Sequence, residues 1–276
     1  PALDSVWDRL TSSPLPTSQS KVILLSNGAL AIRDAIYKHF DGCTDGPKKQ
    51  TTLDGGVQIV LATTTHGAYR TQTSSSNNGD THMGRYDITH AGEGSTHSTD
   101  KEFVQVCQSI GWDSTALSDL DMNIMLWKKL AVNCVINPLT AIHGVKNGQL
   151  LKIEHMGMDI SLVARQILEE VSDVAMMEME SLYDAIHANE GVQHNSKEAW
   201  VQSIRKELSV PSLEAFAFKV MSDTANNISS MLQDVTARRT TEVRYLNGYV
   251  ASLGLEKYGM ECSSNMEMCR LVEEID

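Results

Sequence analysis

The sequence lacks several patterns that would define a class of protein at once. It contains no apolar run of about 18 residues, so we predict no membrane-spanning helix. Its five cysteines are an odd number and form no CxxC pair, which argues against a disulfide framework and a zinc site and favours a reducing compartment. The nine histidines contain no HExxH motif, and we predict no metal.

Basic residues are also few, with 23 Lys and Arg against 35 Asp and Glu, and the net charge is −12. This charge argues against nucleic acid and against an anionic membrane surface as partners. The opening PALDSVWDRL has neither a basic nor an apolar signal region, so we predict no secretory signal and a cytoplasmic location. Because the chain begins with Pro1, we expect either a processed or truncated chain or simple removal of the initiator.

What the chain does contain is globular in character: 276 residues, 41% hydrophobic and 21% charged, are enough to bury a sizeable core. KVILLSNG (21–28) predicts a buried strand and a turn, ALAIRDAIYKHF (29–40) a helix, and VQIVLATTT (57–65) a second strand after a loop over 41–56. Strand, helix and strand at this spacing predict a βαβ unit of a mostly parallel sheet.

The next segments predict smaller structures. AYRTQTS and THMGRYD flank the turn-rich SSNNGD, which is typical of an antiparallel hairpin. HAGEGSTHSTD (90–100) reads as a polar loop whose last residues can cap a helix over KEFVQVCQSI.

Helical periodicity dominates from about residue 119 onward. We predict helices over 119–137, 156–189, 211–234, 240–253 and 263–274, with a polar break at 188–200. The chain is therefore expected to have an α/β domain over 1–118 followed by a helical domain over 119–276.

A polar stripe stands out in WKKLAVNCVINPLTA (127–141). Lys129, Asn133 and Asn137 are spaced by four, so they lie along one helix face with a drift of about 40° per step. Such a stripe is most often a solvated face, but it can also line a pocket. Pro138 favours the pocket, because it removes a backbone donor and clashes with the carbonyl of Cys134, bending or ending the helix beside these side chains.

A second polar cluster lies in the predicted helix over 211–234. Asn227, Ser230 and Asp234 fall at i, i+3 and i+7, although Asn and Ser weaken helix interiors. Either they face water or they belong to a site. Glu242 falls in the first turn of the next predicted helix, where a carboxylate is favourable on its own account.

These residues lie in segments that resemble the ketopantoate reductase (2-dehydropantoate 2-reductase) family. The resemblance runs from residue 1 to about 270, through LLSNG (24–28), ATTTHGAYR (62–70), GDTHMGR (79–85), KLAVNCVINPLTAI (129–142) with NG at 147–148, and NISSMLQDVTARRTTEVRYLNGYV (227–250). It implies a partial Rossmann-like domain followed by a helical C-terminal domain like that of 6-phosphogluconate dehydrogenase. It also implies reduction of ketopantoate to pantoate by NADPH, on the route to pantothenate and coenzyme A.

The resemblance further implies roles for single residues. Lys129 matches the catalytic lysine, and Glu242 matches the acid that works with it and contacts the cofactor. Asn27 matches an asparagine at the junction of cofactor and substrate. The residues that match the substrate-binding positions are Asn133, Asn137, Asn227 and Ser230. These residue types suit the chemistry, because an ammonium can protonate the oxygen that gains charge as hydride reaches a ketone.

The sequence departs from the family pattern in its nucleotide-binding signature. No GxGxxG occurs, and GEGSTH (92–97) lacks the third glycine and follows no apolar strand. In the family this motif precedes the segment at which this chain begins, so we expect the first half of the Rossmann domain to be missing and NADPH binding to be weak. Smaller departures are NGAL at 27–30, Ser263 in place of a usual proline, and a longer polar insertion around 190–210.

Three interpretations follow. The chain is, or derives from, an NADPH-dependent ketopantoate reductase, with a small keto acid as its substrate and a homodimer as its expected assembly. Alternatively, it is a non-catalytic remnant that keeps the helical domain and cannot hold NADPH. A third interpretation is a related 2-keto acid reductase of different specificity.

Overall fold

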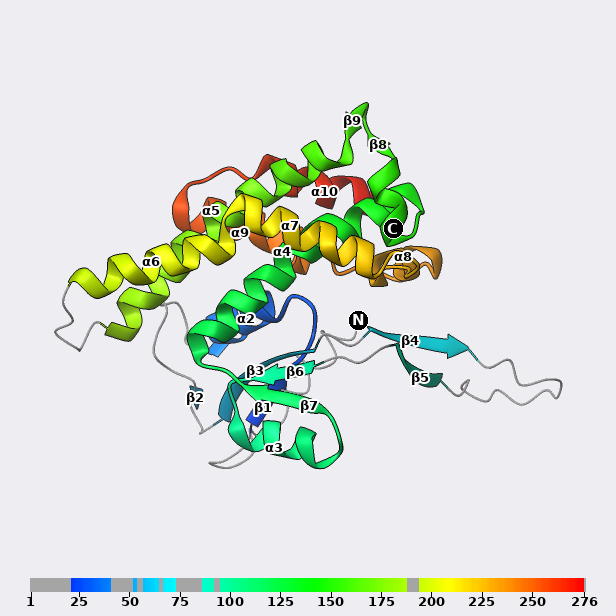
Figure 1. Ribbon diagram of the computed structural model, residues 1–276. Helices are drawn as coiled ribbons and strands as arrows, with labels where there is room; N and C mark the ends of the chain where they lie inside the picture. Colours follow the sequence, from blue (N-terminus) through cyan, green and yellow to red (C-terminus); the bar gives the residue numbers. More distant parts are fainter. Residues whose placement is uncertain are drawn as a thin grey trace. The chain divides into compact units, whose positions relative to one another are not determined.

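The structure is a computed structural model that describes residues 21–40, 52–53, 57–64, 67–72, 86–91, 95–187 and 194–275. The chain forms two compact units (Figure 1). One comprises Pro1–Val22, Ser26–Ile59 and Asn123–Asp276, and the other comprises Ile23–Leu25 and Val60–Met122. The predicted domain boundary near residue 118 stays a prediction, because grouping by spatial contact does not test which fold each segment belongs to.

The largest sheet has the order β1-β3-β6-β7, with β2 beside β3. Its strands are β1 (Lys21–Leu24), β2 (Thr52–Leu53), β3 (Val57–Thr64), β6 (Ser95–Ser98) and β7 (Asp113–Ala116). The strands predicted at 21–24 and 57–64 are confirmed. Among the described pairs β6 is antiparallel to β3 and parallel to β7, so the sheet is mixed and the prediction of a mostly parallel sheet is wrong.

Strand β6 explains this difference, because it lies in the polar stretch that was predicted to be a loop. A polar strand needs partners for its side chains as well as its backbone, and the buried Ser98 hydroxyl donates to the carbonyl of Leu61 at 3.1 Å. The predicted cap that follows is confirmed: Asp100 Oδ1 accepts a hydrogen bond from Phe103 N at 2.8 Å at the start of α3 (Lys101–Ser109).

The predicted hairpin is confirmed as the antiparallel pair β4 (Gly67–Gln72) and β5 (Tyr86–Ala91). Its second strand begins at Tyr86, near the end of THMGRYD, and the register pairs Gly67 with Ala91 and Gln72 with Tyr86. The predicted turn SSNNGD lies outside the described residues.

Helix α2 (Ala29–Phe40) is confirmed, and Gly28 makes its entry possible. Gly28 has φ 67°, in the region that disfavours side chains, and its carbonyl accepts the first helical hydrogen bond from Ile32 N at 3.0 Å. A Cβ at Gly28 would also stand 2.9 Å from the backbone oxygen of Tyr245. The turn that follows β1 therefore needs glycine both for its backbone angle and for close packing.

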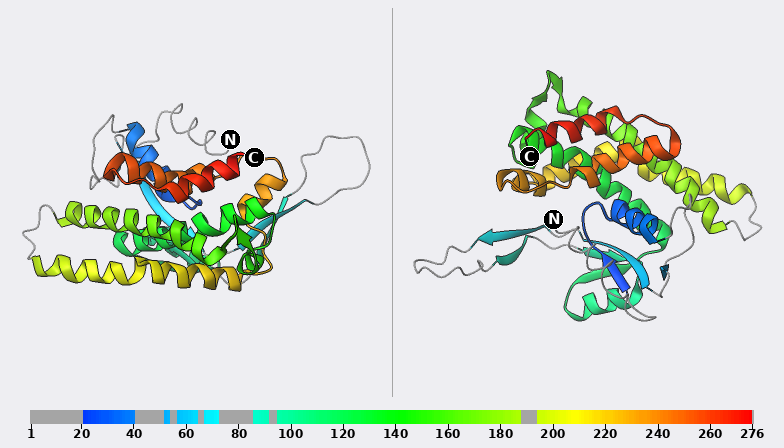
Figure 2. Two further views of the ribbon diagram at one scale, coloured as in Figure 1. Left: turned by 90° about the horizontal axis from the view of Figure 1, so that it is seen from above. Right: turned by 180° about the vertical axis from the view of Figure 1, so that it is seen from behind.

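The chain from residue 119 onward is mostly helical, as predicted. Its elements are α4 (Asp119–His143), η1 (Asn147–Lys152), β8 (Glu154–His155), β9 (Met158–Asp159), α5 (Ile160–His187), α6 (His194–Leu208), α7 (Val210–Asp223), α8 (Ser230–Thr236), η2 (Val243–Tyr245), α9 (Asn247–Tyr258) and α10 (Ser263–Glu273). Figure 2 shows α6 and α7 end to end along α5, with α9 packed beside α10, in agreement with their packing contacts. No helix in the described ranges is long and apolar enough to cross a membrane.

Two helix predictions are wrong. The polar break predicted at 188–200 overlaps α6, whose Trp200, Ile204 and Leu208 recur at helical spacing; Ile204 and Leu208 are buried, and the Trp200 ring packs on Tyr183 at 4.7 Å between centroids. The single helix predicted over 211–234 is two helices, α7 and α8, with a connection at 224–229. Competition from Thr, Asn and Ser side chains for the backbone is the physical reason for that break.

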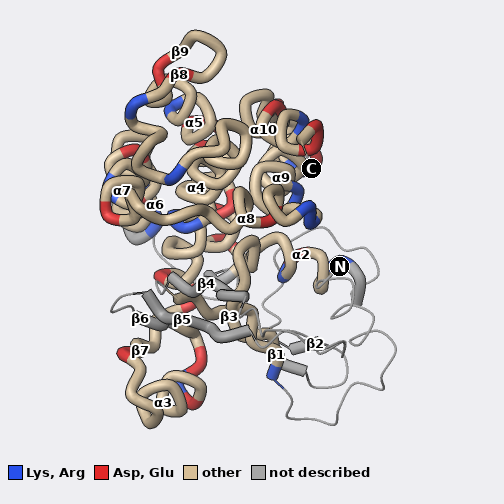
Figure 3. Tube along the Cα trace, turned by 90° about the vertical axis from the view of Figure 1, so that its right-hand side faces the viewer, with Lys and Arg blue, Asp and Glu red and all other residues tan. Residues whose placement is uncertain are grey.

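Charge is distributed as ion pairs of both signs along the last helix. Figure 3 shows basic and acidic residues together on α10, where Arg270 bonds Glu267 at 2.7 Å and also contacts Glu274. These pairs are exposed and contribute little to stability. They keep the outer face of α10 solvated, while Met268, Cys269 and Val272 form its buried face.

Candidate active site

Helix α4 carries the polar stripe and runs five residues beyond Pro138, so of the two predicted effects of Pro138, bending or ending the helix, the ending of the helix at residue 137 is wrong. Proline at this position cannot donate to the carbonyl of Cys134, which is one helical turn earlier. Asn247 supplies the missing donor, because its Nδ2 atom lies 2.9 Å from that carbonyl oxygen. The helix therefore continues because a buried amide from α9 replaces the lost backbone hydrogen bond.

The stripe does not face open solvent. Lys129 and Asn133 are half-buried, and the side chain of Asn137 is buried, with 6% of the residue exposed. The alternative of a solvated helix face is therefore wrong for Asn137 and does not describe the other two. The same helix buries Leu130, Cys134 and other apolar residues on its remaining faces, as the composition of the segment requires.

Asn27 and Glu242 meet this stripe from two other segments of the same unit. Asn133 Nδ2 lies 3.4 Å from Asn27 Oδ1, a long hydrogen bond, and the side chain of Asn27 also hydrogen-bonds the Glu242 carboxylate. Glu242 is the residue immediately before η2, and its side chain caps no helical backbone group. Capping of a helix start therefore does not explain why a carboxylate stands at position 242. The contact with Asn27 does explain it.

Lys129 and Glu242 form an electrostatically coupled pair within a desolvated site. Burial lowers the pKa of Lys129, and the charge of Glu242 raises it in part. Burial raises the pKa of Glu242; the hydrogen bond with Asn27 lowers it, Asp234 raises it, and Lys129 lowers it. For both groups the loss of water outweighs their mutual attraction, so an ammonium here gives up its proton more readily than a surface lysine does.

A small pocket opens where Asn27 meets α4. Polar and apolar residues line it: Ser26, Asn27, Gly28, Ala29, Leu30, Leu126, Lys129, Leu130 and Asn133. Among the described residues no group of three His, Cys, Asp or Glu side chains could hold a metal ion. The residues around this opening include an ammonium, two amides and a hydroxyl, which are groups that can hydrogen-bond to oxygen atoms.

The other two predicted substrate residues lie at the α7–α8 connection. Asn227 is exposed there and not within a helix; its carbonyl accepts from Asn147 N at 3.1 Å. The close approach of the two segments is set by Gly148, where a Cβ would lie 2.5 Å from that of Ala225. The predicted stripe of Asn227, Ser230 and Asp234 on one helix face is therefore wrong.

Ser230 is the first residue of α8 and is exposed. Its neighbour Ser229 caps α8 by accepting from Leu232 N at 3.1 Å, and the Ser229 hydroxyl lies 2.6 Å from that of Thr140. Since Thr140 is three residues beyond Asn137, this bond holds the start of α8 beside the Asn137 end of the stripe. The structure thus places Asn27, Asn133 and Glu242 in one cluster, brings Lys129 within the electrostatic influence of Glu242, and holds Ser230 near Asn137, with Asn227 further along the connection.

Three supporting residues were missed by the sequence interpretation: Asn247, Ser229 and Tyr249. A signal existed for Asn247, because Pro138 leaves one helix carbonyl in need of a buried donor. A signal also existed for Ser229, since serine ahead of a helical segment is a common cap. Nothing in the sequence pattern alone points to the contact that Tyr249 makes.

The class of protein follows from an α/β part, a helical part, and a half-buried lysine and glutamate that interact electrostatically. Residues 121–276 match the family model described as the ketopantoate reductase PanE/ApbA C terminal. The chain belongs to this family, as its sequence motifs predicted, and the predicted fold class of a Rossmann-type part followed by a helical part is confirmed.

Individual relatives agree with this assignment. The chain is 31% identical over 220 residues to 2-dehydropantoate 2-reductase from Shigella flexneri, covering 78% of this chain and 57% of that protein. It is similar in fold to a PanE/ApbA family ketopantoate reductase from Ralstonia eutropha (TM-score 0.60, 19% identity, 99% and 72% coverage). It is also similar to D-mandelate dehydrogenase with NADH (TM-score 0.65, 19% identity, 99% and 74% coverage). The chain thus spans just over half the length of the curated relative.

Proposed function

We propose that the protein to which this chain belongs reduces 2-dehydropantoate (ketopantoate) to pantoate with NADPH, in pantothenate and coenzyme A biosynthesis. Family membership supports the reaction class. The observation that carries the proposal is the half-buried cluster of Lys129, Glu242, Asn27 and Asn133, which three separate segments bring together. A solvent-exposed surface would not require these four side chains to lie together.

In this proposal Lys129 is the general acid. As the carbonyl carbon of the keto acid is reduced, its oxygen gains negative charge, and the Lys129 ammonium stabilises and then protonates it. Glu242 keeps the ammonium charged and oriented, since its charge raises the pKa of Lys129 that burial has lowered. Asn133 and Asn137 hold the hydroxyl and keto end of the substrate, and their positions on one helix fix its orientation.

Ser230 and Asn227 are proposed to hold the substrate carboxylate and its surroundings. The start of α8 is fixed to α4 by the bond between Ser229 and Thr140, so Ser230 has a defined place relative to Asn137. Hydroxyl and amide groups bind a carboxylate without adding charge to the site.

The described residues fit the reacting end of a nicotinamide dinucleotide better than its pyrophosphate. Asn27 and Glu242 offer an amide and a carboxylate beside Lys129, which suits the polar carboxamide of a nicotinamide ring. The sequence contains no GxGxxG turn for the pyrophosphate. When bound, the cofactor supplies the hydride, and NADPH is our proposal for its identity. The 1–118 and 119–276 domain division, a homodimer and a cytoplasmic location likewise stay predictions.

The proposal is tested by assaying the 276-residue chain with NADPH and with NADH against ketopantoate and other 2-keto acids. Because the GxGxxG turn is absent, we expect the chain alone to bind NADPH much more weakly than micromolar in titration calorimetry, so the assay needs millimolar cofactor. We expect ketopantoate to be the preferred substrate. Preference for another keto acid would identify a related reductase, and no reduction of any would favour the non-catalytic alternative.

Glu242→Gln is expected to move the alkaline limb of kcat/KM to lower pH. The acid must be protonated, so activity falls as pH rises through the pKa of Lys129, which already lies below its ordinary 10.5. Removing the carboxylate removes the interaction that raises this pKa, and the limb shifts downward. The control is Glu207→Gln, because Glu207 pairs with the neighbouring Lys128 at 2.7 Å. An unmoved limb in Glu242→Gln would contradict the coupling.

A further inference from the structure

Helix α2 is held against the segment from Glu242 to Tyr249 by three contacts in matching chain order. Asn27 bonds Glu242, Gly28 packs against the backbone of Tyr245, and Asp34 accepts from Tyr249. The first contact belongs to the site described above. The third lies about two helical turns further along α2 and has no part in the proposed chemistry.

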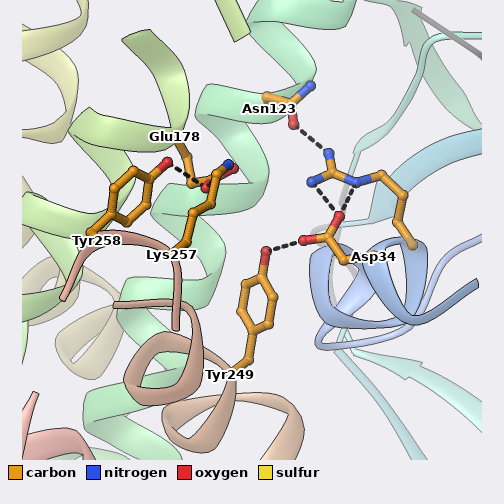
Figure 4. Close-up of polar contacts among 7 residues, drawn as sticks. Asp34, Asn123, Glu178, Tyr249, Lys257 and Tyr258 are labelled. Carbon is orange, nitrogen blue, oxygen red and sulfur yellow. Dashed lines mark hydrogen bonds and ion pairs between the residues drawn. The ribbon is translucent and has the colours of Figure 1, made fainter. Parts of the chain in front are cut away.

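The third contact is short and well supported. Tyr249 Oη donates to Asp34 Oδ2 at 2.6 Å, while Asp34 Oδ1 pairs with Arg33 at 2.8 Å (Figure 4). Burial raises the pKa of the Tyr249 hydroxyl, and the charge of Asp34 raises it further, so the hydroxyl stays protonated and donates. A hydrogen bond to a charged acceptor in a desolvated place is strong and directional.

The same cluster reaches α4, the helix that carries the proposed acid. Arg33 NH1 donates to Asn123 Oδ1 at 2.9 Å, and the Tyr249 ring stacks on Trp127 at 6.2 Å between centroids. Trp127 is two residues before Lys129. Figure 4 shows Tyr249 bonded to Asp34 and Asn123 bonded to the guanidinium paired with Asp34, so the Arg33–Asp34 ion pair links α2 to both α4 and α9.

We propose that Asp34 and Tyr249 are positioning residues that set the start of α2, and with it Asn27, against Lys129 and Glu242. The Asn27–Asn133 hydrogen bond is long, at 3.4 Å, and cannot by itself hold α2 at the site. A rigid helix fixed at Asp34 sets the position of its own first turn, and Asn27 lies two residues before that turn. The consequence for turnover rests on the proposed function, whereas the effect on Lys129 does not.

A matched pair of substitutions separates positioning from stability. Tyr258 lies at the end of the same helix α9 and donates to Glu178 on α5 at 2.6 Å, the same chemistry as the bond of Tyr249. Tyr249→Phe and Tyr258→Phe each remove one hydroxyl from one carboxylate. Only Tyr249→Phe loosens α2.

The experiment measures the pH dependence of covalent labelling of Lys129 by an amine-reactive reagent, read by mass spectrometry. Loosening α2 admits water to Lys129, which raises its pKa toward the ordinary value and lowers the fraction of neutral, reactive amine. In Tyr249→Phe we expect labelling at pH 8 to be slower by about three- to tenfold, corresponding to a pKa rise of about 0.5 to 1. Asp34→Asn is expected to act in the same direction, and Tyr258→Phe to leave the rate unchanged.

Thermal unfolding of each variant is followed alongside. If Tyr249→Phe and Asp34→Asn only lower the melting temperature and Lys129 labels as in the unaltered protein, the cluster is structural and the proposal fails. Equal slowing in Tyr249→Phe and Tyr258→Phe would also overturn it, because the effect would then not depend on α2. Since labelling needs no turnover, absence of reductase activity would overturn the proposed function alone.

Discussion

Lys129→Ala is expected to lower kcat for ketopantoate reduction by about 10²- to 10⁴-fold, the usual contribution of a positioned general acid. The substitution removes the ammonium that neutralises the developing oxyanion, while Asn133 and Asn137 stay in place on α4. KM for ketopantoate should change far less than kcat, because those amides and Ser230 carry the proposed ground-state contacts. Steady-state kinetics at saturating cofactor measure both.

The adjacent lysine provides the control. Lys128 points to a different environment, where its ammonium bonds Glu207 and lies 5.1 Å from the centre of the Phe216 ring. Lys128→Ala removes an equal charge and an equal side chain one residue away, and we expect turnover to stay near that of the unaltered protein. Similar losses in the two variants would point to a general electrostatic effect, and normal turnover in Lys129→Ala would refute the acid role.

Asn247→Leu is expected to lower the free energy of unfolding by about 2–4 kcal/mol, the largest stability effect that we predict. The side chain of Asn247 is fully buried and donates to the Cys134 carbonyl and to Asn265 Oδ1 at 3.0 Å. Leucine keeps a similar volume but leaves both acceptors without that donor. Denaturant unfolding, analysed with equal m-values for the two proteins, measures the change.

Pro138→Ala tests the cause of that loss. Alanine at position 138 restores a backbone N–H one turn after Cys134, which can donate to the carbonyl that Asn247 now satisfies. In a double-mutant cycle the cost of Asn247→Leu should shrink by about 1–2 kcal/mol in the Pro138→Ala background. Additive effects would show that Asn247 stabilises the protein in some other way.

The parts of the fold that could be predicted are those with a strong local signal. Helix α2 follows from apolar periodicity, and the start of α3 follows from Asp100 as a cap. The predictions that are wrong concern segments whose structure depends on contacts with distant parts of the chain. Strand β6 is polar and is a strand only because β3 and β7 lie beside it, and α4 passes Pro138 only because Asn247 comes from a distant segment.

The predictions about the site divide in the same way into those with a local signal and those that depend on distant residues. The spacing of Lys129, Asn133 and Asn137 within one helix indicated a shared face, and the structure confirms a common helix with restricted exposure. The contact of Asn27 with Glu242 joins residues far apart in the chain, so no periodicity could show it. Glu242 was noted at a predicted helix start, but only the family resemblance indicated that both residues belong to one site. The prediction of a polar stripe over 227–234 is wrong because it assumed one continuous helix.

The most direct test of Lys129 as the acid compares two pKa values in the same protein. One comes from the alkaline limb of kcat/KM for ketopantoate, and the other from the pH dependence of Lys129 labelling in the free protein. Because burial lowers the pKa of Lys129, we expect both values to fall below 10.5 and to coincide. Two clearly different values, or a rate that shows no alkaline limb while Lys129 titrates, would contradict the account.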